Sequence, residues 1–154
     1  MTGPEALDAL RDRFPGLRAH PPDSAPGAVV EPDALRSHLL NLRDQLRFDF
    51  LVFVAGLDRP AQSQMELVYR LFSWETKISV ALRVLLPRDA ARVDTVCDIY
   101  RAAEWHERET AEMFGIEFAG HPDPRKLLLP DDIEGHPLRK DFTHPNMIRL
   151  PEVE

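Results

Sequence analysis

Apolar residues in the first half of the chain follow two different periods. One set recurs every three or four residues, as on one face of an α-helix: Leu35, Leu39, Leu42 and Leu46. Pro32 precedes this run, and Asp33 is a residue type that accepts hydrogen bonds from the first free N–H groups of a helix. We therefore predict a helix capped by Asp33. A shorter helix is predicted after Pro4, with an apolar face formed by Leu7, Leu10 and Phe14.

Other apolar runs follow the two-residue period of β-strands. The run Phe48–Leu57 is apolar at both alternations and rich in aromatic and β-branched residues, which favours a strand buried on two faces or at the centre of a sheet. Met65–Trp74 and Lys77–Leu86 alternate more regularly and are separated only by Glu75 and Thr76. These two runs predict an antiparallel hairpin.

Helical character returns after Pro87. The apolar spacing predicts one helix over about 90–100 and another over about 102–113, with Gly115 placed as a C-terminal stop. The predicted order is helix, strand, hairpin and helices, without the strand–helix–strand series of dinucleotide-binding folds. We predict an α+β fold, a two-layer α/β sandwich with a mixed, mainly antiparallel sheet.

Prolines divide the chain into three parts. Six of the 14 prolines lie in residues 1–32 and six in residues 121–154, and proline fixes φ and removes a backbone donor. We predict an irregular N-terminal arm (1–32) with a short helix, an α/β core domain (33–120) and an extended C-terminal strap (121–154). The strap carries apolar residues that favour docking on a partner protein: Leu127, Leu128, Leu129, Ile133, Leu138 and Phe142.

Composition narrows the class of partner. The 154 residues are 44% hydrophobic, enough for one domain, and the net charge of −7 argues against binding to nucleic acid or anionic lipid. The single cysteine, Cys97, cannot by itself form a disulfide, an iron–sulfur cluster or a zinc site. It lies on the predicted 90–100 helix, and we expect its side chain to pack in the protein core. No apolar run approaches the roughly 18 residues of a membrane span. We expect a cytosolic chain that meets the membrane only through a partner.

The charges of the predicted 102–113 helix allow two interpretations. Arg108 lies four residues from both Glu104 and Glu112, which suits a solvated face with weak ion pairs. Alternatively, the charges face a complementary partner, and three apolar residues anchor the helix to that partner: Trp105, Met113 and Phe114. Spacing alone leaves both interpretations open.

Metal and hydrolytic sites receive little support from the spacing. His106 and Glu107 begin the pattern of a zinc protease, but Thr110 stands where the second histidine is required. Four histidines precede proline on backbone that is held extended, and we predict no metal site from them: His20, His121, His136 and His144. A stand-alone hydrolase that uses Glu109 or Glu112 with a bound metal stays as a less favoured hypothesis.

Two segments in the second half resemble a known family. Glu107-Arg108-Glu109 is followed by Glu112 and Phe114, then by His121 and Arg125, and the strap contains GHPLRKDF (Gly135–Phe142). These segments are similar to the hallmarks of the 30 kDa-type (C-type) subunit of the proton-pumping NADH:quinone oxidoreductase, respiratory complex I. Arg47–Asp58 resembles an early strand of that family more loosely.

The resemblance implies a non-catalytic, structural subunit with no flavin, cluster or metal of its own. FMN, iron–sulfur clusters and quinone would belong to other subunits. This chain would pack against the quinone-site (D-type) subunit and lie peripherally on the cytoplasmic side of the inner membrane. An equivalent subunit of a membrane-bound nickel–iron hydrogenase or a ferredoxin-dependent complex is the alternative. The resemblance assigns the partner interface to Glu107, Arg108, Glu109, Glu112, Phe114, His121, Arg125, Gly135, His136, Pro137, Arg139, Lys140, Asp141 and Phe142.

Overall fold

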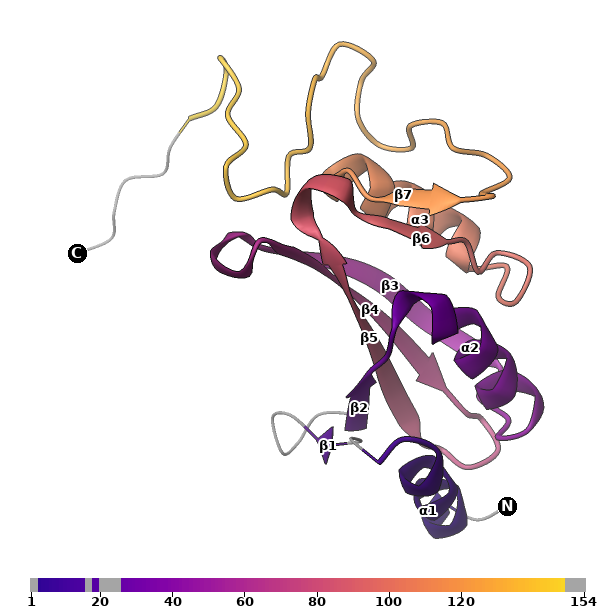
Figure 1. Ribbon diagram of the computed structural model, residues 1–154. Helices are drawn as coiled ribbons and strands as arrows, with labels where there is room; N and C mark the ends of the chain where they lie inside the picture. The colour runs from indigo at the N-terminus through magenta and orange to yellow at the C-terminus, as the bar shows by residue number, and fades with distance from the viewer. Residues whose placement is uncertain (1–2, 16–17, 20–25, 149–154) are drawn as a thin grey trace.

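A five-stranded mixed sheet forms the base of the fold, with strand order β1-β2-β5-β4-β3 (Figure 1). The computed structural model describes residues 3–15, 18–19 and 26–148. The strands are β1 Arg18–Ala19, β2 Pro26–Val29, β3 Phe50–Arg59, β4 Gln64–Phe72 and β5 Ser79–Pro87. β2 and β5 run parallel, whereas the other neighbouring pairs are antiparallel. The predicted mixed sheet and its β4–β5 hairpin are therefore confirmed.

Helices and a second, small sheet complete the described part of the chain. The α-helices are α1 Gly3–Arg13, α2 Leu35–Asp44 and α3 Ala103–Phe114, and the single-turn 3-10 helices are η1 Pro32–Ala34, η2 Pro60–Gln62 and η3 Arg88–Ala90. The parallel strands β6 Arg92–Asp94 and β7 Glu117–Ala119 form the second sheet. The strap runs from β7 along the α3 end of the molecule (Figure 1). No helix among the described residues has the length and apolar content needed to cross a membrane.

One face of the large sheet carries the core. Alternate residues of the central strands β4 and β5 are 0–2% exposed: Met65, Leu67, Tyr69 and Leu71 with Val80, Leu82, Val84 and Leu86. They form one hydrophobic cluster with three leucines of α2 and two residues of the α1 segment: Leu35, Leu39 and Leu42 with Leu10 and Phe14. The opposite face exposes Phe50, Leu57 and Leu85. The predicted two-layer arrangement follows, because the helices cover one face of the sheet.

The N-terminal predictions hold in part. The two predicted helices are α1 and α2, and Leu10 and Phe14 are buried, whereas the Leu7 side chain lies outside those described. Asp33 does not cap α2, because residues 32–34 form η1 and Ala34 occupies the N-cap position without a side-chain bond. Residues 26–29 do not belong to an irregular arm, since β2 pairs with the central strand β5.

β3 lies at the edge of the sheet, so its predicted central position is wrong. Its hydrogen-bonded neighbour in the sheet is β4. Leu51 and Val54 face the core at 3% and 4% exposure, whereas Phe50 and Leu57 on the other alternation are 46% and 39% exposed. Apolar residues at both alternations here reflect an exposed apolar surface rather than burial on two faces.

The helix predicted over 90–100 is also wrong. Residues 92–94 form β6, which pairs with β7 far along the chain, and residues 97–99 and 101–102 form turns. Val93, Val96 and Tyr100 mimic a helical period and are all buried, at 0–4% exposure. The expected packing of Cys97 against the core is confirmed, although it lies in a turn.

α3 lies close to β3 because a glycine leaves room for an aromatic ring. A Cβ atom on Gly56 would lie 2.6 Å from Cδ2 of Phe114. The Thr110 hydroxyl donates to the Val54 carbonyl at 3.4 Å, and the helix ends as predicted at Gly115, whose φ is 72°. The C-terminal half of α3 therefore covers part of the free edge of β3.

A buried carboxylate joins the end of β3 to the strap. Asp58 is 4% exposed and accepts hydrogen bonds from Arg88 Nε and Nη2 at 2.7 and 2.8 Å and from the Lys140 N–H at 2.8 Å. Arg88 also donates to Asp141 at 2.9 Å. The hydrogen bonds from Arg88 are the main cause that lowers the pKa of Asp58 from 3.8 to about 2, so the carboxylate is charged when it holds the strap.

Replacing Gly56 with alanine should destabilise the chain by about 1–3 kcal/mol, because the new methyl group overlaps the Phe114 ring. Urea unfolding of the full chain measures this cost. In the double variant Gly56→Ala/Phe114→Leu, the smaller side chain should relieve the overlap. The double variant should therefore lose less free energy of unfolding than the sum of the losses of the two single variants. Strictly additive costs would show that the two residues do not meet.

The Asp58→Asn variant should lose about 2 kcal/mol or more at pH 6, because Arg88 and the Lys140 N–H lose a charged acceptor. This contribution is complete above the unfolded pKa of 3.8 and is lost as pH falls through the folded pKa of about 2. Urea unfolding at several pH values should therefore show the parent–variant gap shrinking below pH 4. An equal gap throughout would be evidence against this role, and Asp89→Asn, at an exposed aspartate, is the matched control.

Candidate functional site

The first family-like segment lies on α3, where Glu107 is fully buried. Its carboxylate accepts hydrogen bonds from the Val96 N–H at 2.8 Å and from the Thr95 hydroxyl. Burial raises the pKa of Glu107, and these hydrogen bonds oppose the rise. A solvated face is therefore the wrong description of this residue, which fixes the irregular chain before α3.

Glu112 holds the strap through its backbone. The side chain is buried, and its two oxygens accept from three consecutive N–H groups, those of Leu127, Leu128 and Leu129, at 3.4, 2.9 and 2.8 Å. Several N–H donors stabilise a buried carboxylate, and the carboxylate provides acceptors for backbone N–H groups that have no strand partner. The Glu112 carboxylate thus accepts the backbone hydrogen bonds that a neighbouring strand would otherwise accept from this part of the strap.

Arg108, one turn before Glu112 on α3, binds strap carbonyls where Glu112 binds strap N–H groups. Its guanidinium donates to the carbonyls of Arg125 and Lys126, both at 3.0 Å, and lies 3.4 Å from the Asp123 carboxylate. The side chain is only 10% exposed. Arg108 is therefore bound to the strap backbone. The solvated-face interpretation required ion pairs between Arg108 and glutamates of its own helix instead.

The second family-like segment, residues 135–142, meets the C-terminal end of α3. The last carbonyls of a helix have no partner within it, and three of them are paired with strap groups: Glu112 O with His136 Nδ1 at 2.9 Å, Met113 O with the Leu138 N–H at 3.0 Å, and Phe114 O with Arg139 Nε at 2.7 Å. A Cβ on Gly115 would lie 2.5 Å from the His136 ring. Gly115 thus provides both the left-handed turn and the space for this contact.

The remaining predicted residues lie around these contacts. Gly135 has a φ of 86°, and the Phe142 ring packs against it, 3.4 Å from where a Cβ would be. Pro137 is half-buried. The Lys140 N–H donates to Asp58, and Asp141 accepts from Arg88. The structure therefore gathers the two segments at one end of α3. Their role as a partner interface stays a prediction.

Three potential metal ligands lie together: Cys97 Sγ, a Glu107 oxygen and His121 Nε2 are all within 4.8 Å of one another. His121 accepts at Nδ1 from the Asp123 N–H at 3.0 Å, so its Nε2–H donates to the Glu104 carbonyl at 3.0 Å. Burial raises the pKa of the Cys97 thiol to about 12. The Cys97 thiol donates to a Glu107 oxygen at 3.4 Å, so all three side chains are bonded within this chain, and we interpret this group as a hydrogen-bond network that ties the start of the strap to α3.

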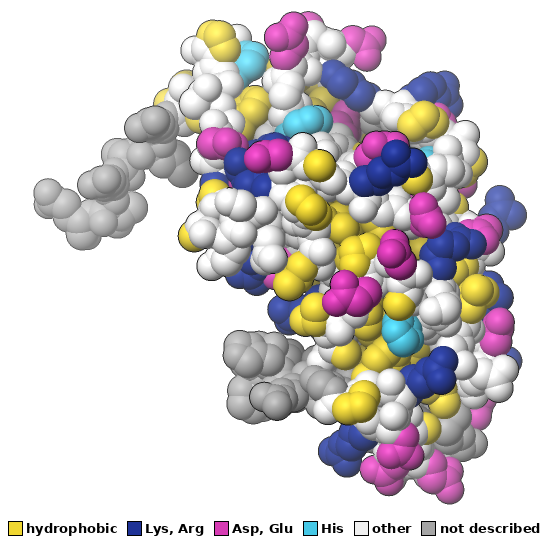
Figure 2. Space-filling view, in the orientation of Figure 1, with side chains coloured by type: hydrophobic (Ala, Val, Ile, Leu, Met, Phe, Trp, Pro, Cys, Tyr) yellow, Lys and Arg dark blue, Asp and Glu magenta, His cyan; other side chains and the backbone are white. Residues whose placement is uncertain are grey.

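The carboxylates of the hydrolase hypothesis do not share one environment. Glu112 is occupied by strap backbone, whereas Glu109 is exposed. On the face drawn in Figure 2, acidic and basic side chains are interspersed, without a broad surface of one sign. Neither feature favours hydrolysis or nucleic-acid binding.

Sequence reasoning missed Asp58 and Arg88. The available signal was an acidic residue that ends an apolar run and an arginine that follows Pro87, but the two are 30 residues apart in the chain. Only the β3–β4–β5 register brings them together.

The Glu112→Gln variant should release the 127–129 backbone, because an amide offers one acceptor oxygen where the carboxylate offers two, and the cost should be about 1–3 kcal/mol. Hydrogen exchange should then speed up at the amides of Leu127–Leu129. Glu109→Gln, at an exposed site of the same helix, is the matched control. Unchanged protection in the Glu112 variant would refute this anchoring role.

Comparison with known proteins gives relatives along most of the chain. The C subunit of F(420)H(2) dehydrogenase from Methanosarcina mazei is 36% identical over 88% of this chain and 89% of its own length. The C subunit of NADH-quinone oxidoreductase from Moorella thermoacetica is 35% identical over 88% of this chain and 92% of its own. A Bdellovibrio bacteriovorus protein, whose name joins the C and D subunits of NADH-quinone oxidoreductase, is 44% identical over 68% of this chain and 19% of its own.

Solved structures share the fold. A chain of the membrane-bound sulfane sulfur reductase, an archaeal respiratory membrane complex, superposes with a TM-score of 0.79 at 29% identity, covering 92% of this chain and 85% of that one. The trypsin-resistant fragment of Nqo5 superposes with a TM-score of 0.67 at 27% identity, covering 77% and 98%. The family model for the 30 kDa subunit of respiratory-chain NADH dehydrogenase matches residues 28–147. This span holds strands β3 to β7, α2, α3 and the strap contacts, and the chain belongs to that family.

Proposed function

We propose that this chain is a non-catalytic, structural subunit of a complex I-type oxidoreductase that packs against the quinone-site (D-type) subunit. The observation that carries the proposal is the strap, whose backbone is held on α3 while apolar side chains face outward. These side chains are 48–90% exposed: Leu128, Leu138, Met147 and Ile148. A positioned backbone with exposed apolar side chains loses little entropy when it docks on another protein.

The fused relative supports a D-like neighbour. In Bdellovibrio bacteriovorus, one polypeptide carries the name of both subunits, so a C-like part and a D-like part are covalently joined there. We infer that the strap of this chain lies along a D-like partner. The chain would then be peripheral on the cytoplasmic side of the inner membrane, held there by other subunits.

Electron transfer is assigned to those partners. The carboxylates of Glu107 and Glu112 and both ring nitrogens of His121 are engaged by this chain's own groups. We infer that FMN, iron–sulfur clusters and quinone are held by other subunits of the NADH:quinone oxidoreductase. The contribution of this chain is to fix the position of the quinone-site subunit.

A second candidate differs in the electron donor of the complex. Relatives include a subunit of an F(420)H(2) dehydrogenase and a chain of a sulfane sulfur reductase. These relatives favour the alternative that this chain is the equivalent subunit of a complex with another electron donor. A membrane-bound nickel–iron hydrogenase and a ferredoxin-dependent complex are two such complexes. The structural role of the chain is the same in both candidates.

Purification through an affinity tag on this chain, from detergent-solubilised membranes, tests the proposal. We expect a large D-like subunit to co-purify in a complex that oxidises NADH. Oxidation of reduced F420, ferredoxin or hydrogen without NADH oxidation would select the second candidate. Recovery of the tagged chain without any large subunit would contradict the structural role itself.

Deletion of residues 143–154 tests the strap separately. The isolated chain should stay folded, because the strap bonds to α3 and Asp58 come from residues before 143. Recovery of the D-like subunit should fall about tenfold or more, since apolar anchors are lost from the interface. Full recovery would place the docking surface elsewhere, and circular dichroism of the truncated chain monitors its fold.

A further inference from the structure

Glu109 differs from the other charges of its segment. Glu107, Arg108 and Glu112 are each engaged by backbone or side chains of this chain. Glu109 is exposed, and among the described residues it makes no hydrogen bond or ion pair. Three charges of this segment thus serve the internal structure, and one is left for a partner.

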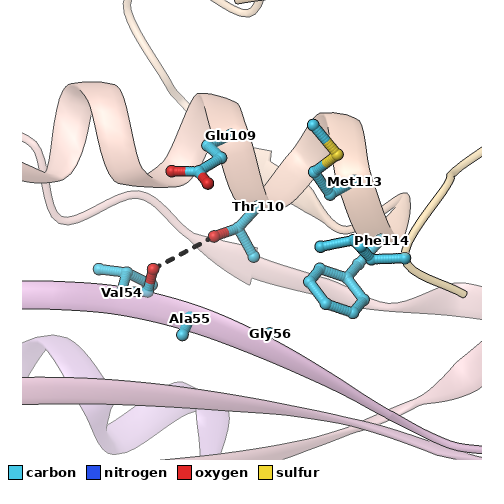
Figure 3. Close-up of a pocket in the computed structure, with 8 residues that line it drawn as sticks. Val54, Ala55, Gly56, Glu109, Thr110, Met113 and Phe114 are labelled. Carbon is cyan, nitrogen blue, oxygen red and sulfur yellow. Dashed lines mark hydrogen bonds between the residues drawn. The ribbon is translucent and has the colours of Figure 1, made fainter. Parts of the chain in front are cut away.

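An open groove lies beside Glu109. It has a volume of about 170 Å³ and lies between β3 and α3, with strand residues 54–56 on one side and Met113 and Phe114 on the other; Leu138 of the strap also lines it. Figure 3 shows the Glu109 carboxylate on the strand side of the helix, over Val54. Apart from Glu109 and Thr110, the side chains that line the groove are apolar, and the Thr110 hydroxyl is already bonded to Val54.

Exposed apolar residues flank the groove. Trp105, Glu109 and Met113 are spaced four residues apart, so they form one stripe along α3. Trp105 is 59% exposed and Leu138 is 54% exposed. The surface is therefore an acidic group set between two apolar ends, with a cavity beneath it that can take one side chain.

We propose that this groove receives a segment of the large partner subunit that places an apolar side chain between β3 and α3 and an arginine or lysine on Glu109. Docking removes the Glu109 carboxylate from water, and a cation on the partner offsets that cost. An apolar side chain fits the lining, and central apolar anchors carry much of the energy of protein interfaces. This inference rests on the proposed function, because it names the surface through which the subunit would assemble.

The test uses the tagged chain in the membrane complex. Glu109→Lys should reduce recovery of the large subunit about tenfold or more, because two cations then face each other. Glu109→Gln should reduce it less, and binding should become less sensitive to salt. Glu31→Lys makes the same charge change at an exposed glutamate outside the groove and should leave recovery unchanged. Thermal unfolding of each isolated chain should match the parent.

A reciprocal change identifies the partner cation. Replacing that arginine or lysine with glutamate should restore recovery by the Glu109→Lys chain, which a purely structural role of Glu109 would not produce. Normal recovery with Glu109→Lys, or equal loss with Glu31→Lys, would overturn this inference and leave the proposed function standing. A parent chain that recovers no large subunit would instead overturn the proposed function. A change of the isolated chain's oligomeric state in Glu109→Lys would assign the groove to a second copy and refute the partner assignment.

Discussion

The free carbonyl groups at the C-terminal end of α3 determine where the strap lies. A helix leaves its last carbonyls without internal partners, and burying them unpaired is costly. Here residues 136, 138 and 139 of the strap supply partners for three of them. Gly115 makes this possible, because any larger residue would collide with the His136 ring. The position of Leu138 at the groove follows from the same bonds.

Buried carboxylates organise the rest of the irregular chain. Glu107, Glu112 and Asp58 each accept at least one backbone N–H from segments that have no strand partner there. In each case an ionised or buried acid gains donors that compensate for lost water. A strap rich in proline can therefore hold one conformation without strands, because side chains of α3 and β3 take over the role of a neighbouring backbone.

The sequence predicted what depends on local period, and it failed where distant pairing decides. The leucine spacing of α2 and the regular alternation of β4 and β5 were sufficient, because each period can be read within its own segment and β4 pairs with β5 across a short turn. β6 was missed because its partner β7 lies beyond α3, and Val93, Val96 and Tyr100 pack in the core without being helical. The edge position of β3 could not be told from its composition. The burial of Glu107 and Glu112 also escaped, because spacing suggests helix-surface ion pairs and cannot show the strap folding back.

Relatives with different donors bear on what this fold is for. The chain is 36% identical to a subunit named for F(420)H(2) and 35% identical to one named for NADH, over the same share of its length. Similarity that does not follow the donor supports the proposal that the shared structure does not recognise the donor. The features described above are internal bonds of the strap and an outward surface on α3, which suit contact with a protein that such complexes have in common. Because function resides in sites rather than in folds, donor choice then falls to other chains, in keeping with the structural role proposed above for this chain.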